Sequence, residues 1–179
     1  MVLIHSMNPW HDITPGKEAP AVINTIIEIP KGSRMKYELH KESGMIMLDR
    51  VSHTTNVYPG DYGFMPQSYW EDGDPLDVMV LCDDGVVPNT LTHVRVIGVL
   101  HMVDDGESDD KILGVYDDDP RYDNVRNLSD ISQHRLDEIQ HYFETYKGLQ
   151  DKKVEVTGCS EVDAAHEAVK KSMRLYKER

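Results

Sequence analysis

Three aspartates lie ahead of an apolar run, in the segment Asp72-Gly73-Asp74-Pro75-Leu76-Asp77. Gly73 and Pro75 favour a tight turn, and the apolar residues after Asp77 predict entry into a core strand. Carboxylates held this close repel one another unless a cation lies between them. Oxygen ligands of this kind suit Mg²⁺ or Mn²⁺, so the segment predicts a divalent-metal site rather than a solvated turn. An EF-hand is excluded, because Leu76 and Asp77 stand where that loop needs an oxygen ligand and a glycine.

A second acidic segment, Asp104-Asp105-Gly106-Glu107-Ser108-Asp109-Asp110-Lys111, lies between two predicted strands. Its composition alone is typical of a polar hairpin loop. Lys111 would weaken a lone metal site, but it suits a phosphate bound beside metals. The run from Asp117 to Asp119, with Asp83 and Asp84, is interpreted as solvated surface.

Cations and phenols accompany these acids. In a strand, Lys36 and Glu38 share one face, which by itself is typical of an exposed charge pair. The segment Tyr58–Phe64 is rich in turn-forming residues and in phenols, which can donate hydrogen bonds to phosphate oxygens. Tyr146-Lys147 repeats the combination of a phenol and a cation near the end of a predicted helix.

The elements that must position these residues are mainly strands. Apolar patterning predicts strands at 22–29, 35–39, 45–48, 78–81, 94–103, 112–116 and 154–157. Apolar spacings of three and four predict a helix over Ser132–Lys147, stopped by Gly148, and a second helix over Ser160–Lys177. Residues 1–20 predict an irregular lead-in with one helical turn after Asn8-Pro9. We expect a single domain over 1–179, of α+β class but mainly β, in which the helices pack on a small barrel.

The charge balance narrows the class of protein. The chain has 179 residues, 39% of them hydrophobic, with 19 basic and 32 acidic side chains and a net charge of −13. This composition excludes a mainly disordered chain, and the negative charge disfavours nucleic-acid and membrane partners. No apolar run reaches the roughly 18 residues of a membrane span, and no signal peptide is evident. Cys82 and Cys159 form neither a disulfide framework nor a zinc pair, so we expect a cytoplasmic protein.

The ordered set of motifs resembles the soluble family I inorganic pyrophosphatases. The segment from Asp72 to Val78 is similar to the family signature D-[SGDN]-D-[PE]-hydrophobic-D-hydrophobic. The resemblance runs from about Val22 to Gly158 and also rests on the segments Ile27-Glu28-Ile29-Pro30, Lys36-Tyr37-Glu38, Asp49-Arg50, Tyr58-Pro59, Asp61-Tyr62-Gly63 and Tyr142-Phe143-Glu144-Thr145-Tyr146-Lys147.

The resemblance implies metal-dependent hydrolysis of pyrophosphate to two orthophosphates, with Mg²⁺, or else Mn²⁺ or another divalent ion, as cofactor. Asp74 would deprotonate a metal-bridging water, and Tyr62 would hydrogen-bond the metal and water cluster. The implied metal ligands are Asp72, Asp77, Asp104 and Asp109; the outer acids are Glu28 and Glu38; the substrate-binding residues are Lys36, Arg50, Tyr58, Lys111, Tyr146 and Lys147. The resemblance also implies a closed five-stranded OB-like barrel and the homohexamer of the short prokaryotic form.

Two other functions compete with this enzyme. A non-catalytic acidic divalent-metal-binding barrel module would keep the carboxylates, but it would have no use for Lys36, Arg50, Lys111 and Lys147. An oligonucleotide-binding barrel needs a basic groove with exposed aromatic residues. A net charge of −13 with 7% aromatic residues argues against that binding function.

Overall fold

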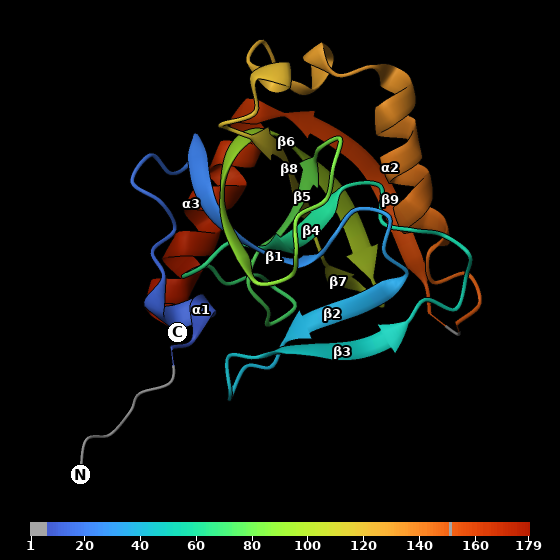
Figure 1. The fold of residues 1–179 in the computed structure, drawn as a ribbon, viewed down its shortest axis with the longest axis horizontal. Coiled ribbons are helices and arrows are strands. Elements are labelled where there is room, and N and C mark those ends of the chain that lie inside the picture. The colour runs from blue at the N-terminus through green and yellow to red at the C-terminus, as the bar shows by residue number, and fades with distance from the viewer. Residues whose placement is uncertain (1–6, 151) are drawn as a thin grey trace.

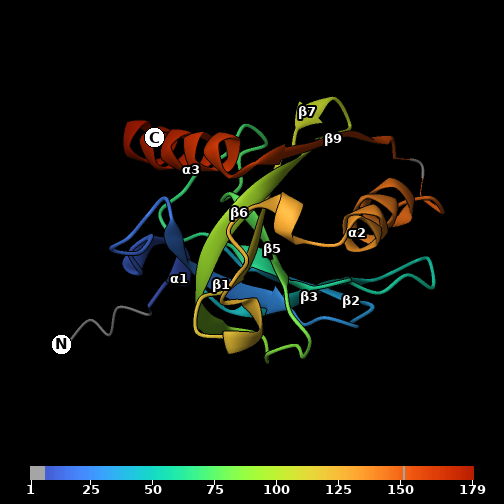
Figure 2. The same cartoon turned by 90° about the horizontal axis from the view of Figure 1, so that it is seen from above.

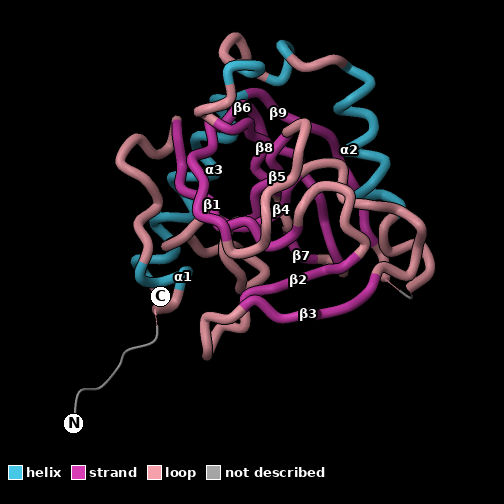
Figure 3. Tube along the Cα trace, in the orientation of Figure 1, coloured by secondary structure: helices cyan, strands magenta, loops and turns pink. Residues whose placement is uncertain are grey.

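A ring of strands forms the centre of the molecule (Figures 1 and 3). The computed structural model describes residues 7–150 and 152–179. Five strands close into a barrel in the order β1-β4-β5-β8-β6, because β6 pairs with both β8 and β1. Each neighbouring pair in the ring is antiparallel except β5 and β8, which are parallel. The predicted closed five-stranded barrel is therefore confirmed.

The strands are β1 (Val22–Ile29), β2 (Met35–Leu39), β3 (Ile46–Val51), β4 (Asp61–Phe64), β5 (Asp77–Leu81), β6 (Thr90–Asp104), β7 (Glu107–Ser108), β8 (Lys111–Tyr116) and β9 (Val154–Glu161). β7 and β9 both pair with β6, whose 15 residues extend beyond the barrel. β2 and β3 form a separate two-stranded sheet beside it (Figure 1).

The helices are α1 (Pro9–Asp12), α2 (Gln133–Thr145) and α3 (Val162–Glu178), with 3₁₀ turns at Pro120–Tyr122 and Leu128–Asp130. Figure 2 shows α2 and α3 at separate positions around the barrel. The predicted helical turn after Asn8 is present as α1, and the Asn8 side chain accepts a hydrogen bond from the Trp10 amide at 3.0 Å. Within the described residues, no helix combines the length and hydropathy that a membrane crossing needs.

Two hydrophobic cores lie on opposite faces of β5, as the two-residue period of this strand shows. Val78 and Val80 belong to the core that includes α3, whereas Met79 and Leu81 belong to the core that includes α2. Successive side chains of a strand point to opposite faces, so both faces of β5 are buried. The first residue of the same strand is the predicted metal ligand Asp77, which the two cores therefore hold on a rigid support.

Two glycines allow close packing in the barrel. A Cβ atom on Gly63 would lie 1.9 Å from the Ile26 carbonyl oxygen, at the bulge where β1 crosses β4. A Cβ on Gly98 would lie 2.3 Å from Leu128, next to a register shift between β6 and β8. Because real Cβ contacts are longer, both positions require glycine.

Several predicted boundaries were wrong. Residues 61–64, in the segment noted for its turn-forming residues, form strand β4, which the patterning did not predict, and all four are buried. The C-terminal helix begins at Val162 rather than Ser160, because Ser160 pairs with Val99 in the ladder between β9 and β6. The helix predicted to reach Lys147 ends at Thr145, and β3 covers Ile46–Val51 rather than 45–48.

Part of the surplus acid predicted to be solvated surface has structural partners instead. Asp117 Oδ1 accepts a hydrogen bond from Arg95 Nε at 2.8 Å. The Asp119 side chain is only 10% exposed and caps the Pro120–Tyr122 turn. Asp83 Oδ1 accepts a hydrogen bond from Tyr122 at 3.1 Å. These acids stabilise the loops between β8 and α2, whereas Asp84 is exposed as expected.

Candidate functional site

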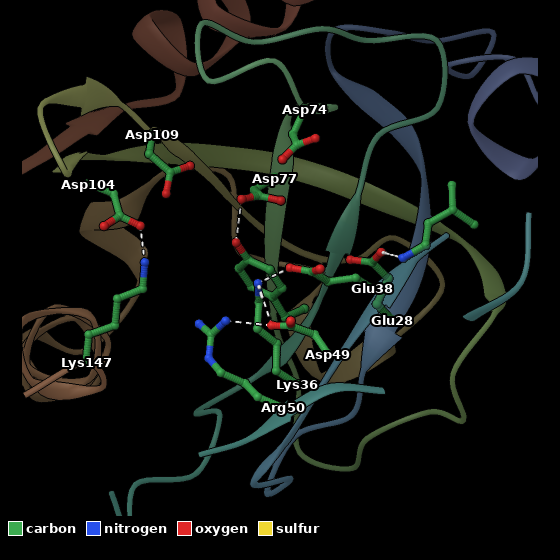
Figure 4. Close-up of polar contacts among 12 residues, drawn as sticks. Glu28, Lys36, Glu38, Asp49, Arg50, Asp74, Asp77, Asp104, Asp109 and Lys147 are labelled. Atoms are coloured by element: carbon green, nitrogen blue, oxygen red, sulfur yellow. Dashed lines mark hydrogen bonds and ion pairs between the residues drawn. The ribbon is translucent and has the colours of Figure 1, made fainter. Parts of the chain in front are cut away.

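The residues predicted to form the site converge on one pocket of about 200 Å³. Every predicted site residue except Arg50 lines it, and Figure 4 shows ten of the acids and cations around it. The predicted lining residues are Glu28, Lys36, Glu38, Tyr58, Tyr62, Asp72, Asp74, Asp77, Asp104, Asp109, Lys111, Tyr146 and Lys147. They come from the barrel strands β1, β4, β5, β6 and β8, from β2, from the loops next to these strands and from the segment after α2, so the barrel, the β2–β3 sheet and α2 together bring them into one pocket.

The turn from Asp72 to Asp77 is held by its own hydrogen bonds. Gly73 has φ 86°, a backbone conformation that glycine adopts easily. The Asp74 amide donates to Asp72 Oδ1 at 3.0 Å, and the Asp74 carbonyl accepts from Trp70 at 2.7 Å. Leu76 is fully buried and anchors the end of the turn. This local order directs three carboxylates into one pocket.

Lys111 joins two of the predicted metal ligands. Its ammonium group lies 2.5 Å from Asp77 Oδ2 and also pairs with Asp109. Asp77 and Lys111 are register partners in the parallel pair β5–β8, which explains their contact. Burial alone would lower the pKa of Lys111, but the carboxylates of Asp77 and Asp109 outweigh it and raise the pKa. The lysine is therefore a charged group, although its side chain is only 2% exposed.

Asp104 and Lys147 form a second ion pair at the other side of the pocket (Figure 4). Asp104 is the last residue of β6, and Lys147 follows α2. Asp104 Oδ1 is buried and has no hydrogen-bond partner among the residues that the structure describes. Burial lowers the pKa of Lys147, and its bond to Asp104 opposes that shift. A buried carboxylate oxygen without a donor is an available ligand for a cation.

Tyrosine rings cover one wall of the pocket. The Tyr62 hydroxyl donates to Asp77 Oδ2 at 2.5 Å. Tyr58 and Tyr62 have ring centroids 5.4 Å apart, and Tyr142 lies 5.0 Å from Tyr58 and 5.5 Å from Tyr146. Burial raises the pKa of Tyr58, Tyr62 and Tyr146, so these phenols stay protonated and act as hydrogen-bond donors.

The outer acids differ in their burial. Glu28 is 7% exposed and accepts a hydrogen bond from the Leu39 amide at 2.7 Å. Burial, and then the nearby charge of Asp77, raise the pKa of Glu28 to about 8. Glu38 is half-exposed and pairs with Lys36. The two predicted outer acids thus differ in burial and in their partners within the same pocket.

Arg50 is held beside the pocket by Asp49, a residue for which no role was predicted. Lys36 Nζ lies 3.6 Å from Asp49 Oδ2, and Arg50 donates to the same oxygen at 2.5 Å. Asp49 therefore links the two cations (Figure 4). The adjacent residues Asp49 and Arg50 were the available signal, but a two-residue period alone does not show that Asp49 contacts both Lys36 and Arg50.

Lys41 and Trp10 are among the pocket residues that were not predicted. Lys41, in the turn between β2 and β3, forms an ion pair with Asp74. Its carbonyl accepts a hydrogen bond from Asn8 Nδ2 at 2.7 Å, and its ammonium lies 5.8 Å from the centre of the Trp10 ring. Trp10 itself lines the pocket. Contacts between the lead-in and a hairpin turn leave no periodic signal in the sequence.

The donor set fits a divalent cation. Burial raises the pKa of Asp72 to about 7, and the charges of Asp77 and Asp109 add to this shift. A cation among these carboxylates would relieve that repulsion and supply a partner for Asp104 Oδ1. Over the described part of the chain, no three acids, histidines or cysteines lie together as a ready-made metal site. Because Lys111 bridges Asp77 and Asp109, binding a cation there requires this ammonium group to move aside.

Comparisons with known proteins agree with this geometry. A sequence model described as "Inorganic pyrophosphatase" matches residues 25–177. The chain is 47% identical over 171 residues to soluble inorganic pyrophosphatase 3 of Arabidopsis thaliana, covering 96% of this chain and 79% of that protein. It is 44% identical over 171 residues to soluble inorganic pyrophosphatase 2 of Chlamydomonas reinhardtii, covering 96% and 89%.

Solved structures show the same similarity in three dimensions. The inorganic pyrophosphatase of Thermus thermophilus superposes with a TM-score of 0.92 at 42% identity, covering 96% of this chain and 99% of that one. The inorganic pyrophosphatase of Helicobacter pylori superposes with a TM-score of 0.88 at 38% identity, covering 92% and 98%. The similarity therefore includes the barrel and both long helices.

Proposed function

Because the chain belongs to the inorganic pyrophosphatase family, we propose that the pocket described above is the active site of an enzyme that hydrolyses inorganic pyrophosphate to two orthophosphates. The observation that carries this assignment is the composition of one small pocket, where seven carboxylates and four lysines meet. The carboxylates suit cations, and the lysines suit the phosphate oxygens that those cations accompany.

The family is metal-dependent, and we propose Mg²⁺, or else Mn²⁺, as the cofactor of this chain. The unpaired oxygen of Asp104 and the crowded carboxylates of Asp72, Asp77 and Asp109 support these four residues as its ligands. When bound, the cations supply Lewis-acid polarisation of the phosphoryl oxygens and acidify a water molecule.

Asp74 is the best-placed proton acceptor. Its side chain is half-exposed at the pocket while its backbone is fixed by the turn, so it can meet a water molecule without losing its position. As the oxygen of that water bonds to phosphorus and the bridging P–O bond breaks, Asp74 takes the proton of the water. Tyr62 keeps Asp77 in place through its 2.5 Å hydrogen bond.

The cations and phenols hold the substrate. Lys36 and Arg50 stand on one side and Lys147 on the other (Figure 4), and Lys111 lines the same pocket beside Asp77 and Asp109, so phosphate oxygens can be bound at both ends. Tyr58 and Tyr146, kept protonated by burial, donate hydrogen bonds. Together these groups neutralise the negative charge that grows on the leaving phosphate. A non-catalytic metal-binding module has no use for four such cations.

Phosphate release from pyrophosphate, followed as Mg²⁺ is titrated, tests the proposal, with ATP as a comparison substrate. We expect metal-dependent release by the wild type and a loss of about 10²–10⁴-fold in turnover for Asp74→Asn, as for removal of a general base. Asp84→Asn, at an exposed aspartate outside the pocket, is the matched control and should keep wild-type turnover. Thermal unfolding checks that both variants fold.

The outcomes separate the enzyme from the role of Asp74. Absence of metal-dependent phosphate release by the wild type would contradict the enzyme proposal. Near-normal turnover of Asp74→Asn at saturating Mg²⁺ would leave the enzyme standing but reject Asp74 as the base.

We also propose that the chain works as a cytoplasmic homo-oligomer, a hexamer, without nucleic-acid or membrane partners. Exposed apolar side chains on and beside β2 and β3 support subunit contacts: Met35, Met45, Met47, Leu48 and Val51. Light scattering on the purified protein measures the number of subunits, and a monomeric mass at micromolar concentration would contradict the assembly.

A further inference from the structure

His101 connects three segments behind the acidic hairpin. It lies on β6, and its Nδ1 is 3.0 Å from Asp110 Oδ2, in the connection between β7 and β8. Its Nε2 is 2.9 Å from Ser160 Oγ on β9. β7 and β9 both pair with Val103 and Asp104 at the end of β6, so they flank this end of the strand. Both ring nitrogens are therefore engaged by partners on different elements.

The two partners of His101 determine which ring nitrogen donates a hydrogen bond and which accepts one. A carboxylate accepts hydrogen bonds only, so Nδ1 carries a proton and donates it to Asp110. In the neutral ring, Nε2 then accepts from the Ser160 hydroxyl, and in the protonated ring it donates to the hydroxyl oxygen instead. The bridge is thus compatible with either state of the ring.

The bridge adds to the contacts that hold this segment, which include the bond from the Asp105 amide to the Lys153 carbonyl at 3.0 Å. β7 has only two residues, which pair with Val103 and Asp104 of β6. Asp105 and Gly106, which start the hairpin, have φ of 50° and 95°. In the Asp109–Lys111 connection, Asp109 is fixed through its amide, which donates to Met102 at 2.9 Å.

Asp110 lies between two residues of the pocket. Asp109 and Lys111 line the pocket, whereas Asp110 contacts His101 on the other side of the chain. Extended backbone turns residues i and i+2 to one face and residue i+1 to the opposite face. Fixing the direction of Asp110 therefore fixes the direction in which Asp109 and Lys111 face the pocket.

We propose that His101 is a positioning residue of the active site, which ties Asp110 to Ser160 and thereby orients Asp109 and Lys111. The inference rests on the proposed function, because it assigns His101 to the support of that same site. It predicts that the loss of the imidazole weakens metal binding through residues that the imidazole does not touch.

The chain offers a matched control for this experiment. His93 lies on the same strand β6 and is 3.9 Å from Asp118, but both side chains are well exposed and neither lines the pocket. His93→Ala therefore removes an imidazole from the same element without affecting the hairpin. His101→Asn serves as the conservative variant, because an amide donor can retain the bond to Asp110 while the bond to Ser160 is lost.

Two measurements on the full chain test the proposal: Mn²⁺ binding without substrate, followed by calorimetry, and the Mg²⁺ concentration that gives half-maximal phosphate release. We expect His101→Ala to weaken both by about 10-fold, as for the loss of a residue that supports metal ligands. His101→Asn should recover part of the loss, and His93→Ala should match the wild type. Thermal unfolding identifies a variant that fails to fold.

The proposal is overturned if His101→Ala and His93→Ala have the same Mn²⁺ affinity and need the same Mg²⁺ concentration for half-maximal phosphate release. This holds even if the melting temperature of His101→Ala falls. Failure of the proposed function is distinguishable, because an inactive wild type would leave the Mn²⁺ binding comparison intact. A 10-fold loss of Mn²⁺ affinity confined to His101→Ala would then still support the positioning role.

Discussion

Raising the pH from 6 to 8 in metal-free buffer should destabilise the protein through one buried carboxyl group. Glu28 is 7% exposed, and its carboxyl accepts a hydrogen bond from Leu39 at 2.7 Å. Burial, followed by the charge of Asp77, raises the pKa of Glu28 from 4.5 to about 8. In this pH range the folded chain therefore keeps a proton on Glu28 that the unfolded chain has already lost.

The direction and size of the effect follow from proton linkage. Because the unfolded chain binds fewer protons than the folded chain here, the free energy of unfolding falls as the pH rises. The loss is about 1.4 kcal/mol per pH unit and flattens as the pH reaches the folded-state pKa. Between pH 6 and 8 it amounts to about 2 kcal/mol, or about 4–8 °C in melting temperature for a chain of this size.

Thermal unfolding of wild type and Glu28→Gln, in chelator at pH 6 and pH 8, measures this loss of stability. Protein concentration must be constant, since the melting temperature of an oligomer depends on it. Other groups titrate in both proteins, so the difference between their pH dependences isolates Glu28. Asp84→Asn, which removes an exposed carboxylate outside the pocket, is the control and should follow the wild type. Equal pH dependences for wild type and Glu28→Gln would refute the reasoning.

Two further substitutions separate binding from stability. Lys111→Met removes the buried cation between Asp77 and Asp109, and we expect kcat/KM for pyrophosphate to fall by about 10²–10³-fold. Steady-state kinetics measures this change. Lys152→Met, at a half-exposed lysine, is the control. Arg95→Ala removes a side chain that donates to the Asp117 carboxylate and to the carbonyls of Asp117, Tyr122 and Val125. We expect Arg95→Ala to lower the free energy of unfolding by about 3 kcal/mol in urea titrations without changing kcat. Arg174→Ala, at an exposed arginine, should change neither quantity. A large loss of kcat in Arg95→Ala would contradict its structural role.

The turn from Asp72 to Asp77 was predictable because its signals are local. Gly73 and Pro75 restrict the backbone, and the apolar run after Asp77 places that residue at the start of a core strand. β4 was missed for the opposite reason. Its residues 61–64 are all buried, so their sequence does not alternate between apolar and polar residues. Gly63 within the strand, and Pro59 and Gly60 just before it, are residue types typical of loops.

Where sequence reasoning failed, a partner distant in the chain decided the structure. Ser160 has the sequence of a helix cap, yet its pairing with Val99 keeps it in a strand. Asp117 has the sequence of a solvated turn, yet Arg95, 22 residues earlier, makes it a structural partner. Local propensity contributes fractions of a kcal/mol, so such tertiary contacts outweigh it.

The ion pairs of the pocket connect the folding of the chain to its chemistry. Lys147 is 43 residues from Asp104, and Lys111 is 34 residues from Asp77, so each pair forms only when the barrel and α2 are in place. The same lysines that neutralise the acids in this structure are the groups that we assign to phosphate. A divalent cation on those acids would free the ammonium groups for the substrate, which suggests that cation and pyrophosphate bind cooperatively. The net charge of −13 thus disfavours a nucleic acid, which approaches the whole surface, but it does not disfavour a small anion that enters a pocket together with its cations.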